Sequence, residues 1–190
     1  MRRRQFLSGA RIYLRNLERS DVEGNYGYWL NDPEVCRFNA HHRFPYAKGD
    51  LADYIEGLRG THDRLVLAII DREGDQHVGN ISLQSMDPLE RSAEFAIVIG
   101  EKSAWGKGFS KEAARLILDH GFGALNLHRV YCGTSSENVP MQKLALAMGF
   151  SLEGRRREAL YKNFAYLDIL EYGLLRCEWQ AASTREASSS

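Results

Sequence analysis

The stretch IVIGEKSAWGKGFS, residues 97–110, decides the fold, because three different patterns meet in it. Ile97, Val98 and Ile99 end a run of β-branched and apolar residues of the kind that forms strands. From Ser110 onward the apolar residues recur at helical spacing instead. The stretch therefore predicts a strand, a glycine-rich turn and an amphipathic helix in succession.

The turn inside this stretch consists of Trp105, Gly106, Lys107, Gly108 and Phe109. The first turn of a helix has unpaired N–H groups and the positive end of the helix dipole, and glycines let an anion approach the backbone closely. Lys107 adds a positive charge nearby. We therefore predict that the backbone amides of residues 106–110 bind phosphate.

Two widespread phosphate motifs do not fit this turn. A dinucleotide fingerprint needs three glycines in the order G-x-G-x-x-G, and residue 111 is lysine. A Walker loop ends in Gly-Lys-Ser/Thr, whereas Gly106 and Lys107 are followed by Gly108. Both nucleotide-binding classes are excluded.

The rest of the chain alternates between the same two kinds of element. Strands are predicted over residues 11–17, 65–70, 78–83, 93–99, 129–133, 150–152 and 164–175. Helices are predicted over residues 20–30 (with Ser20 and Asp21 as N-caps), 50–58, 110–122 and 139–148. Runs of strands separated by single helices indicate a mixed α/β (α+β) domain and argue against a regular doubly wound sheet.

Composition limits the partners of the chain. Its 190 residues suit one domain, and 25 Lys+Arg balance 25 Asp+Glu, so the formal net charge is zero. No overall field therefore draws the protein to nucleic acid or to a membrane surface. We expect a short extension over residues 1–9, one domain over residues 10–179, and a small polar, disordered tail over residues 180–190.

The three cysteines, Cys36, Cys132 and Cys177, are far apart and form no C-x-x-C pair. We interpret them as buried, reduced thiols, which is typical of a cytoplasmic protein. No apolar run approaches the roughly 18 residues that span a bilayer. The spacing of His, Cys, Asp and Glu suggests no metal site.

Three segments together resemble one enzyme family. The turn at residues 105–110 resembles the pyrophosphate loop of the GNAT N-acetyltransferases, Q/R-x-x-G-x-G/A, and NVPMQKLALAMGF at residues 138–150 resembles their second signature. Upstream, WLNDPEV at residues 29–35 resembles the branch that contains ribosomal-protein N-terminal and amino-sugar acetyltransferases. Spermidine acetyltransferases share much of the central stretch. The likeness covers about residues 10–179.

The resemblance implies a fold and a co-substrate. The fold would be GNAT-like: a central, mostly antiparallel sheet of about seven strands, splayed at the cofactor site and flanked by about four helices. The backbone of Ile97, Val98 and Ile99 would pair with the pantetheine arm of acetyl-CoA and polarise its thioester carbonyl. The amides of residues 106–110 would hold the pyrophosphate, and Asn138 would reach the pantetheine arm. Trp105 replaces the usual Gln or Arg of the loop.

The implied function is acetyl transfer from acetyl-CoA to a primary amine by direct attack in a ternary complex. Three acceptors remain open: a protein N-terminus, an amino sugar, and a polyamine or other small amine. The protein could also form a homodimer. Ala145 stands where many GNAT enzymes carry the tyrosine that protonates the leaving thiolate. A non-catalytic acetyl-CoA sensor or interaction module therefore remains an alternative.

Two carboxylates are candidates for the catalytic base. A lysine-like ammonium has a pKa of about 10.4, so presenting it as a free amine at pH 7 costs roughly 4–5 kcal/mol. Glu94, just before the cofactor strand, is the first candidate, and a charge on a solvated face is its structural alternative. Asp168, among apolar neighbours, is the second, and a partner for an arginine is its structural alternative.

Other polar groups fit structural roles better. Ser135 and Ser136 lie between a strand and a helix, where serines usually cap, although either could supply an acid or an anchoring hydroxyl. The adjacent His41 and His42 lie where the acceptor loops of GNAT enzymes lie, but they lack the spacing of a helical metal pair and are interpreted as a solvated loop. The arginine run at residues 155–157 is interpreted as a solvated turn that could meet an anionic substrate.

Overall fold

The seven predicted strands and one further strand, β1, form one open eight-stranded sheet in the computed structural model, which describes residues 5–187. The strands are β1 Leu7–Ser8, β2 Ile12–Asn16, β3 Leu65–Asp71, β4 Gln76–Asp87, β5 Ser92–Ile99, β6 Arg129–Ser135, β7 Ser151–Lys162 and β8 Ala165–Leu175. Their order is β1-β2-β3-β4-β5-β6-β8-β7, and every neighbouring pair is antiparallel except β5 and β6. The predicted mixed, mostly antiparallel fold class is confirmed.

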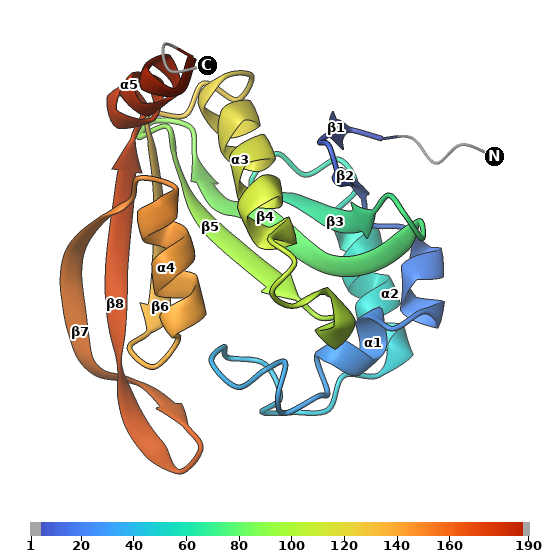
Figure 1. Cartoon of the computed structure of the whole chain (residues 1–190). Helices are drawn as coiled ribbons and strands as arrows, with labels where there is room; N and C mark the ends of the chain where they lie inside the picture. Colours follow the sequence, from blue (N-terminus) through green and yellow to red (C-terminus); the bar gives the residue numbers. More distant parts are fainter. Residues whose placement is uncertain (1–4, 188–190) are drawn as a thin grey trace.

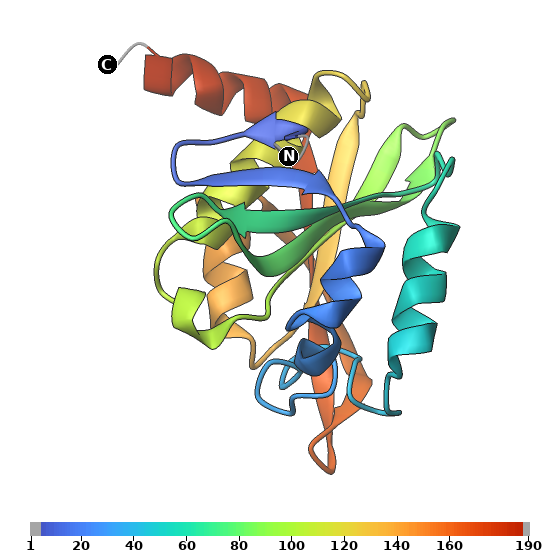
Figure 2. The same ribbon diagram turned by 90° about the vertical axis from the view of Figure 1, so that its right-hand side faces the viewer.

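Helices cover both faces of this sheet (Figure 2). On one face lie the 3-10 helix η1 Arg19–Glu23, α1 Tyr26–Trp29 and α2 Lys48–Gly57. On the other face lie α3 Phe109–Phe122 and α4 Val139–Ala147, preceded by the short 3-10 helix η2 Lys102–Ala104, and α5 Arg176–Ala187 ends the described chain. None of the helices described is long and apolar enough to cross a membrane.

Each face has its own hydrophobic core. The larger core is built around α3, where Ala113, Ile117 and Leu118 are buried against the sheet. The smaller core joins α1 and α2 to the opposite face of β2 and β3, with Trp29 and Leu51 among its members. Strand alternation explains the division, because successive residues of one strand point to opposite faces. Each face of the sheet therefore has its own packed helices, and each can carry a different binding site.

The sheet opens between β5 and β6. These parallel strands pair only at Ser92–Arg129, Ala93–Val130 and Glu94–Tyr131. Beyond Glu94 the two strands separate, so the two halves of the sheet diverge toward the bottom of Figure 1. The splay expected at the cofactor strand is present.

The first helix departs from its prediction. A single helix with Ser20 or Asp21 as N-cap was expected over residues 20–30, but η1 and α1 replace it, and Glu18 is the N-cap. Asp21 lies in the first turn, where its Oδ2 accepts the Glu18 N–H at 2.8 Å. Its carboxylate also pairs with the buried Arg15 of β2 at 2.6 Å, and this pairing fixes the turn at that point.

Two C-terminal predictions are also corrected. The tail expected to be disordered from residue 180 continues α5 as far as Ala187, and residues 188–190 lie outside the described residues. The buried Trp179 anchors this helix, because its ring stacks on Phe122 and its Nε1 donates to Asp119 at 2.9 Å. The strand expected at residues 150–152 extends to Lys162, so the arginines of residues 155–157 lie on β7 rather than in a solvated turn.

Candidate active site

The glycine-rich turn has the geometry of an anion site. Gly106 and Gly108 have φ angles of 75° and 77°, in the left-handed region that favours glycine. Gly108 is the N-cap of α3, so the first-turn amides of a helix of 14 residues point out of its N-terminus. A Cβ placed on Gly106 would meet no atom within 4 Å, so the space beside the turn is open. Glycine is favoured at position 106 because of its φ angle, and not because neighbouring atoms leave too little space for a Cβ.

Arg11, near the N-terminus of the chain, holds the turn in place. Arg11 Nη1 donates to the carbonyl of Lys107 at 2.7 Å, and Arg11 Nε pairs with Glu112 of α3 at 3.0 Å. Glu112 also accepts the N–H groups of Arg11 and Ile12. Burial raises the pKa of Glu112, but these donors outweigh it and hold the pKa below its ordinary value. The turn therefore carries a second cation that the local sequence does not reveal.

Trp105 closes the other side of the turn. Its indole Nε1 donates to the carbonyl of Ile99 at 2.8 Å, which ties the end of β5 to the start of α3. The segment WLNDPEV packs against the same connection. A Cβ on Gly100 would lie 2.0 Å from the ring of Trp29, and Lys102 Nζ pairs with Asp32 at 2.8 Å. This segment thus supports the connection from β5 to α3.

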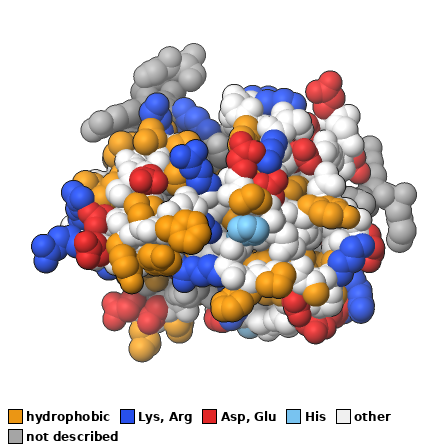
Figure 3. Space-filling view, turned by 90° about the horizontal axis from the view of Figure 1, so that it is seen from below, with side chains coloured by type: hydrophobic (Ala, Val, Ile, Leu, Met, Phe, Trp, Pro, Cys, Tyr) orange, Lys and Arg blue, Asp and Glu red, His pale blue; other side chains and the backbone are white. Residues whose placement is uncertain are grey.

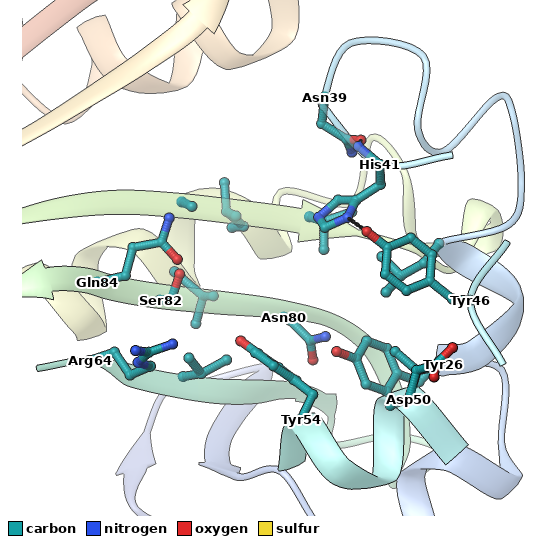
Figure 4. A pocket seen from close by; sticks show the side chains of 17 residues that line it. Tyr26, Asn39, His41, Tyr46, Asp50, Tyr54, Arg64, Asn80, Ser82 and Gln84 are labelled. Atoms are coloured by element: carbon teal, nitrogen blue, oxygen red, sulfur yellow. Dashed lines mark hydrogen bonds between the residues drawn. The ribbon is translucent and has the colours of Figure 1, made fainter. Parts of the chain in front are cut away.

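A cavity of about 500 Å³ lies on the opposite face of the sheet (Figure 4). Its floor comes from β3, β4 and β5, and its walls come from α1, α2 and the loop before α2. Ala96, Ile97 and Val98 of β5 line it. Among the residues described, nothing pairs with β5 on the β6 side after Glu94. The same short segment of β5 is therefore both an open edge of the sheet and part of the cavity floor.

The two candidate bases lie in different surroundings. Glu94 is partly buried at the last β5–β6 pair, and Gln84, which lines the cavity, donates its Nε2 to Glu94 at 3.3 Å. Asp168 of β8 is not among the lining residues; it pairs with Arg155 of β7 and accepts the Glu158 N–H at 2.7 Å. These two partners hold the pKa of Asp168 below its ordinary value. Neither carboxylate is among the lining residues: Glu94 contacts the lining residue Gln84, and Asp168 has the contacts of a structural carboxylate.

His41 was missed by the sequence analysis. Its side chain lines the cavity instead of facing solvent from a loop, and its Nδ1 lies 2.9 Å from the Tyr46 hydroxyl. Lys162, at the tip of the β7–β8 hairpin, donates to the His41 carbonyl at 2.7 Å. Burial, with a smaller contribution from the Lys162 charge, lowers the pKa of His41. His42, with φ of 60°, is exposed as expected.

A family model described as "Acetyltransferase (GNAT) domain" matches residues 11–151. The chain belongs to the GNAT acetyltransferase family. The resemblance inferred from the three sequence segments is therefore confirmed.

Named relatives of this GNAT protein cover nearly all of it. An uncharacterized N-acetyltransferase p20 of Bacillus licheniformis is 30% identical over 89% of this chain and 95% of its own length. Spermidine N(1)-acetyltransferase of Escherichia coli is 28% identical over 92% of this chain and 91% of its own. A crystal structure of spermidine N-acetyltransferase from Vibrio cholerae in complex with CoA and spermine superposes with a TM-score of 0.82, at 25% identity, over 90% of this chain and 99% of that one.

These similarities identify the GNAT protein as an acetyl-CoA-dependent N-acetyltransferase rather than a non-catalytic module. The residues present fit the co-substrate. The glycine turn leaves its backbone and neighbouring space open for phosphate, and β5 offers unpaired backbone groups to the amides of a pantetheine arm.

The structure shows what surrounds two residues of the second signature, Asn138 and Ala145. Asn138 caps α4, because its Oδ1 accepts the Met141 N–H at 3.2 Å and its Nδ2 donates to Thr134 at 3.1 Å. Ala145 is buried in the larger core, so α4 presents no hydroxyl there. Ser135 is also buried, and its Oγ accepts the Glu137 N–H at 3.2 Å in the turn before α4; the N-cap of that helix is Asn138 and not a serine.

Proposed function

We propose that this acetyltransferase acetylates a small primary amine that binds in the cavity between α2 and β5, by direct attack on the thioester of acetyl-CoA. One observation supports this most strongly: the open edge of β5 that suits the pantetheine arm also lines the cavity. Both substrates could then lie against Ala96, Ile97 and Val98 from opposite faces of the sheet. Such a ternary complex needs no covalent enzyme intermediate.

On the cofactor side, each group has one task. Backbone groups of Ile97, Val98 and Ile99 would pair with the pantetheine arm, and the amides of residues 106–110 would bind the pyrophosphate. Lys107 would add a positive charge, and Trp105 would hold the turn against β5. Asn138 would act by positioning the start of α4 next to β6. When bound, acetyl-CoA supplies the activated acetyl group.

On the acceptor side, Glu94 is the proposed base. It stands where the strands part and shares a hydrogen bond with the cavity residue Gln84. It would take the proton that the amine loses as the N–C bond forms and the C–S bond breaks. The thiolate needs no strong acid, because an ordinary thiol has a pKa of about 8.5. Asp168 is the weaker candidate, because its carboxylate already pairs with Arg155 and accepts the Glu158 N–H.

The cysteines support direct transfer. Cys36 and Cys132 are buried, and burial raises the pKa of Cys132 to about 12, so it carries no thiolate near neutral pH. Cys177, on α5, is exposed, contrary to the expectation that all three thiols are buried. A homodimer and a cytoplasmic location stay predictions.

Release of CoA thiol in the presence of a panel of primary amines tests this proposal. Turnover with at least one amine, together with its acetylated product, is the expected result. Acetyl-CoA binding by calorimetry without turnover of any amine would refute it.

A further inference from the structure

The cavity contains very few charges. Of the 17 residues that line it, only Asp50 and Arg64 belong to the Asp, Glu, Lys and Arg types. The other polar lining residues are neutral or weakly basic: Tyr26, Asn39, His41, Tyr46, Tyr54, Asn80, Ser82 and Gln84. A wall of this composition suits hydrogen bonding to a small polar molecule better than the binding of several positive charges.

The single acidic lining residue is already engaged. Asp50 lies in the first turn of α2, and its Oδ2 accepts the Ala47 N–H at 2.9 Å. On the face seen in Figure 3, Asp and Glu side chains are scattered among Lys and Arg rather than gathered in one acidic area. Neither the cavity nor this face offers the acidic surroundings that a polycation needs.

Arg64 stands close to the proposed site of transfer. Leu65 pairs with Leu83, so Arg64 lies beside Gln84, and Gln84 in turn pairs with Glu94. Figure 4 shows the Arg64 side chain directed into the cavity near Ser82 and Gln84. Its Nε and Nη2 also donate to the carboxylate of the neighbouring, exposed Asp63 at 3.1 and 2.6 Å, so an anionic ligand would share or displace this partner. Arg64 therefore lines this end of the cavity, and the Glu94 carboxylate, which is not itself a lining group, lies two strands away beside the lining residue Gln84.

We infer, on the basis of the function proposed above, that the preferred acceptor is a zwitterion: one primary amine with a carboxylate or phosphate close to it. The ammonium group would approach Glu94 and the anion would approach Arg64. Neighbouring strands are about 4.8 Å apart, so the two backbones are separated by roughly 10 Å, which leaves room between the side chains for a compact molecule. Arginine suits this role because its planar group binds carboxylate or phosphate through two hydrogen bonds. A polyamine would instead bring further positive charges toward Arg64.

Matched pairs of acceptors test this inference with the full-length enzyme. Serine is compared with serinamide, which lacks the carboxylate, and glucosamine 6-phosphate with glucosamine; spermidine is the polycation. We expect kcat/KM to be at least tenfold higher for the acidic member of one pair than for its neutral partner and for spermidine. The pair that shows the preference identifies the anion as carboxylate or phosphate.

Variants then assign the preference to Arg64. Arg64→Gln should remove it, Arg64→Lys should keep part of it, and both should bind acetyl-CoA as the parent does. Arg59→Gln is the matched control, because Arg59 is exposed, pairs with Glu56 and does not line the cavity. The inference is wrong if neutral amines or spermidine are the better substrates, or if Arg64→Gln leaves the preference unchanged. An enzyme that acetylates none of these or any other amine contradicts the proposed function instead.

Discussion

Replacing Gly106 with aspartate should weaken acetyl-CoA binding mainly through charge, and an alanine variant isolates that effect. A Cβ at Gly106 meets no atom within 4 Å, so neither side chain collides with the protein. Both variants must adopt the left-handed φ of 75°, which costs about 1–2 kcal/mol for a residue with a Cβ. The comparison between aspartate and alanine removes this shared cost. Gly108 is less suitable, because a Cβ there lies 3.3 Å from the Arg11 guanidinium.

The remaining difference is the repulsion between a carboxylate and the pyrophosphate. Two unit charges 4 Å apart interact by about 1 kcal/mol in water and about 4 kcal/mol at an effective dielectric constant of 20. We expect Gly106→Asp to bind acetyl-CoA at least tenfold more weakly than Gly106→Ala, or about 1.4 kcal/mol. Calorimetric titration at low and at high salt measures this, and salt should narrow the gap. Equal affinities of the two variants, with intact circular dichroism, would refute the assignment of the turn to phosphate.

Three further predictions concern the base and the stability of the fold. Glu94→Gln should lower kcat/KM about 10²-fold near pH 7, and the loss should shrink as the pH approaches the pKa of the amine; an equal loss at every pH in steady-state assays would make Glu94 structural. Asp21→Ala leaves the guanidinium of Arg15 buried without its partner, so urea denaturation should show a loss of about 3–5 kcal/mol, and a loss below 1 kcal/mol would contradict the buried pair. Burial lowers the pKa of His77, so the folded state disfavours the protonated imidazole. The free energy of unfolding should therefore be highest above the ordinary histidine pKa of about 6.5 and should fall as the pH drops through the lower pKa of the folded state. Thermal unfolding between pH 7.5 and pH 5 should show this decline, and His77→Gln should flatten it.

Local patterns were sufficient to predict the strand, turn and helix that carry the proposed cofactor site. The strand ending at Ile99, the turn at residues 105–109 and α3 follow from periodicity, glycine spacing and helix-terminus chemistry, all of which act within a few residues. The support from Arg11 could not be predicted in this way, because Arg11 is 96 residues from the Lys107 carbonyl that it binds. Contacts of this kind depend on which strands become neighbours.

The acceptor half was harder to predict for the same reason. The middle of β7, residues 155–158, is a run of charged residues, and most of its side chains are exposed, so no hydrophobic alternation marks it as a strand. Without β7, the partner of Asp168 was unknown, and its apolar neighbours left a catalytic role open. Likewise His41 lies in a loop with no regular pattern, and Lys162, which binds its carbonyl, is 121 residues away.

Initial-rate kinetics test the central claim, that amine and acetyl-CoA meet at the open edge of β5 in a ternary complex. Rates are measured over a range of amine concentrations at several fixed concentrations of acetyl-CoA, with the best acceptor from the panel. The account predicts double-reciprocal lines that intersect, and no acetyl group on Cys36, Cys132 or Cys177 after incubation with labelled acetyl-CoA alone. Parallel lines together with a labelled cysteine would show that the acetyl group passes through the enzyme, and would contradict direct attack.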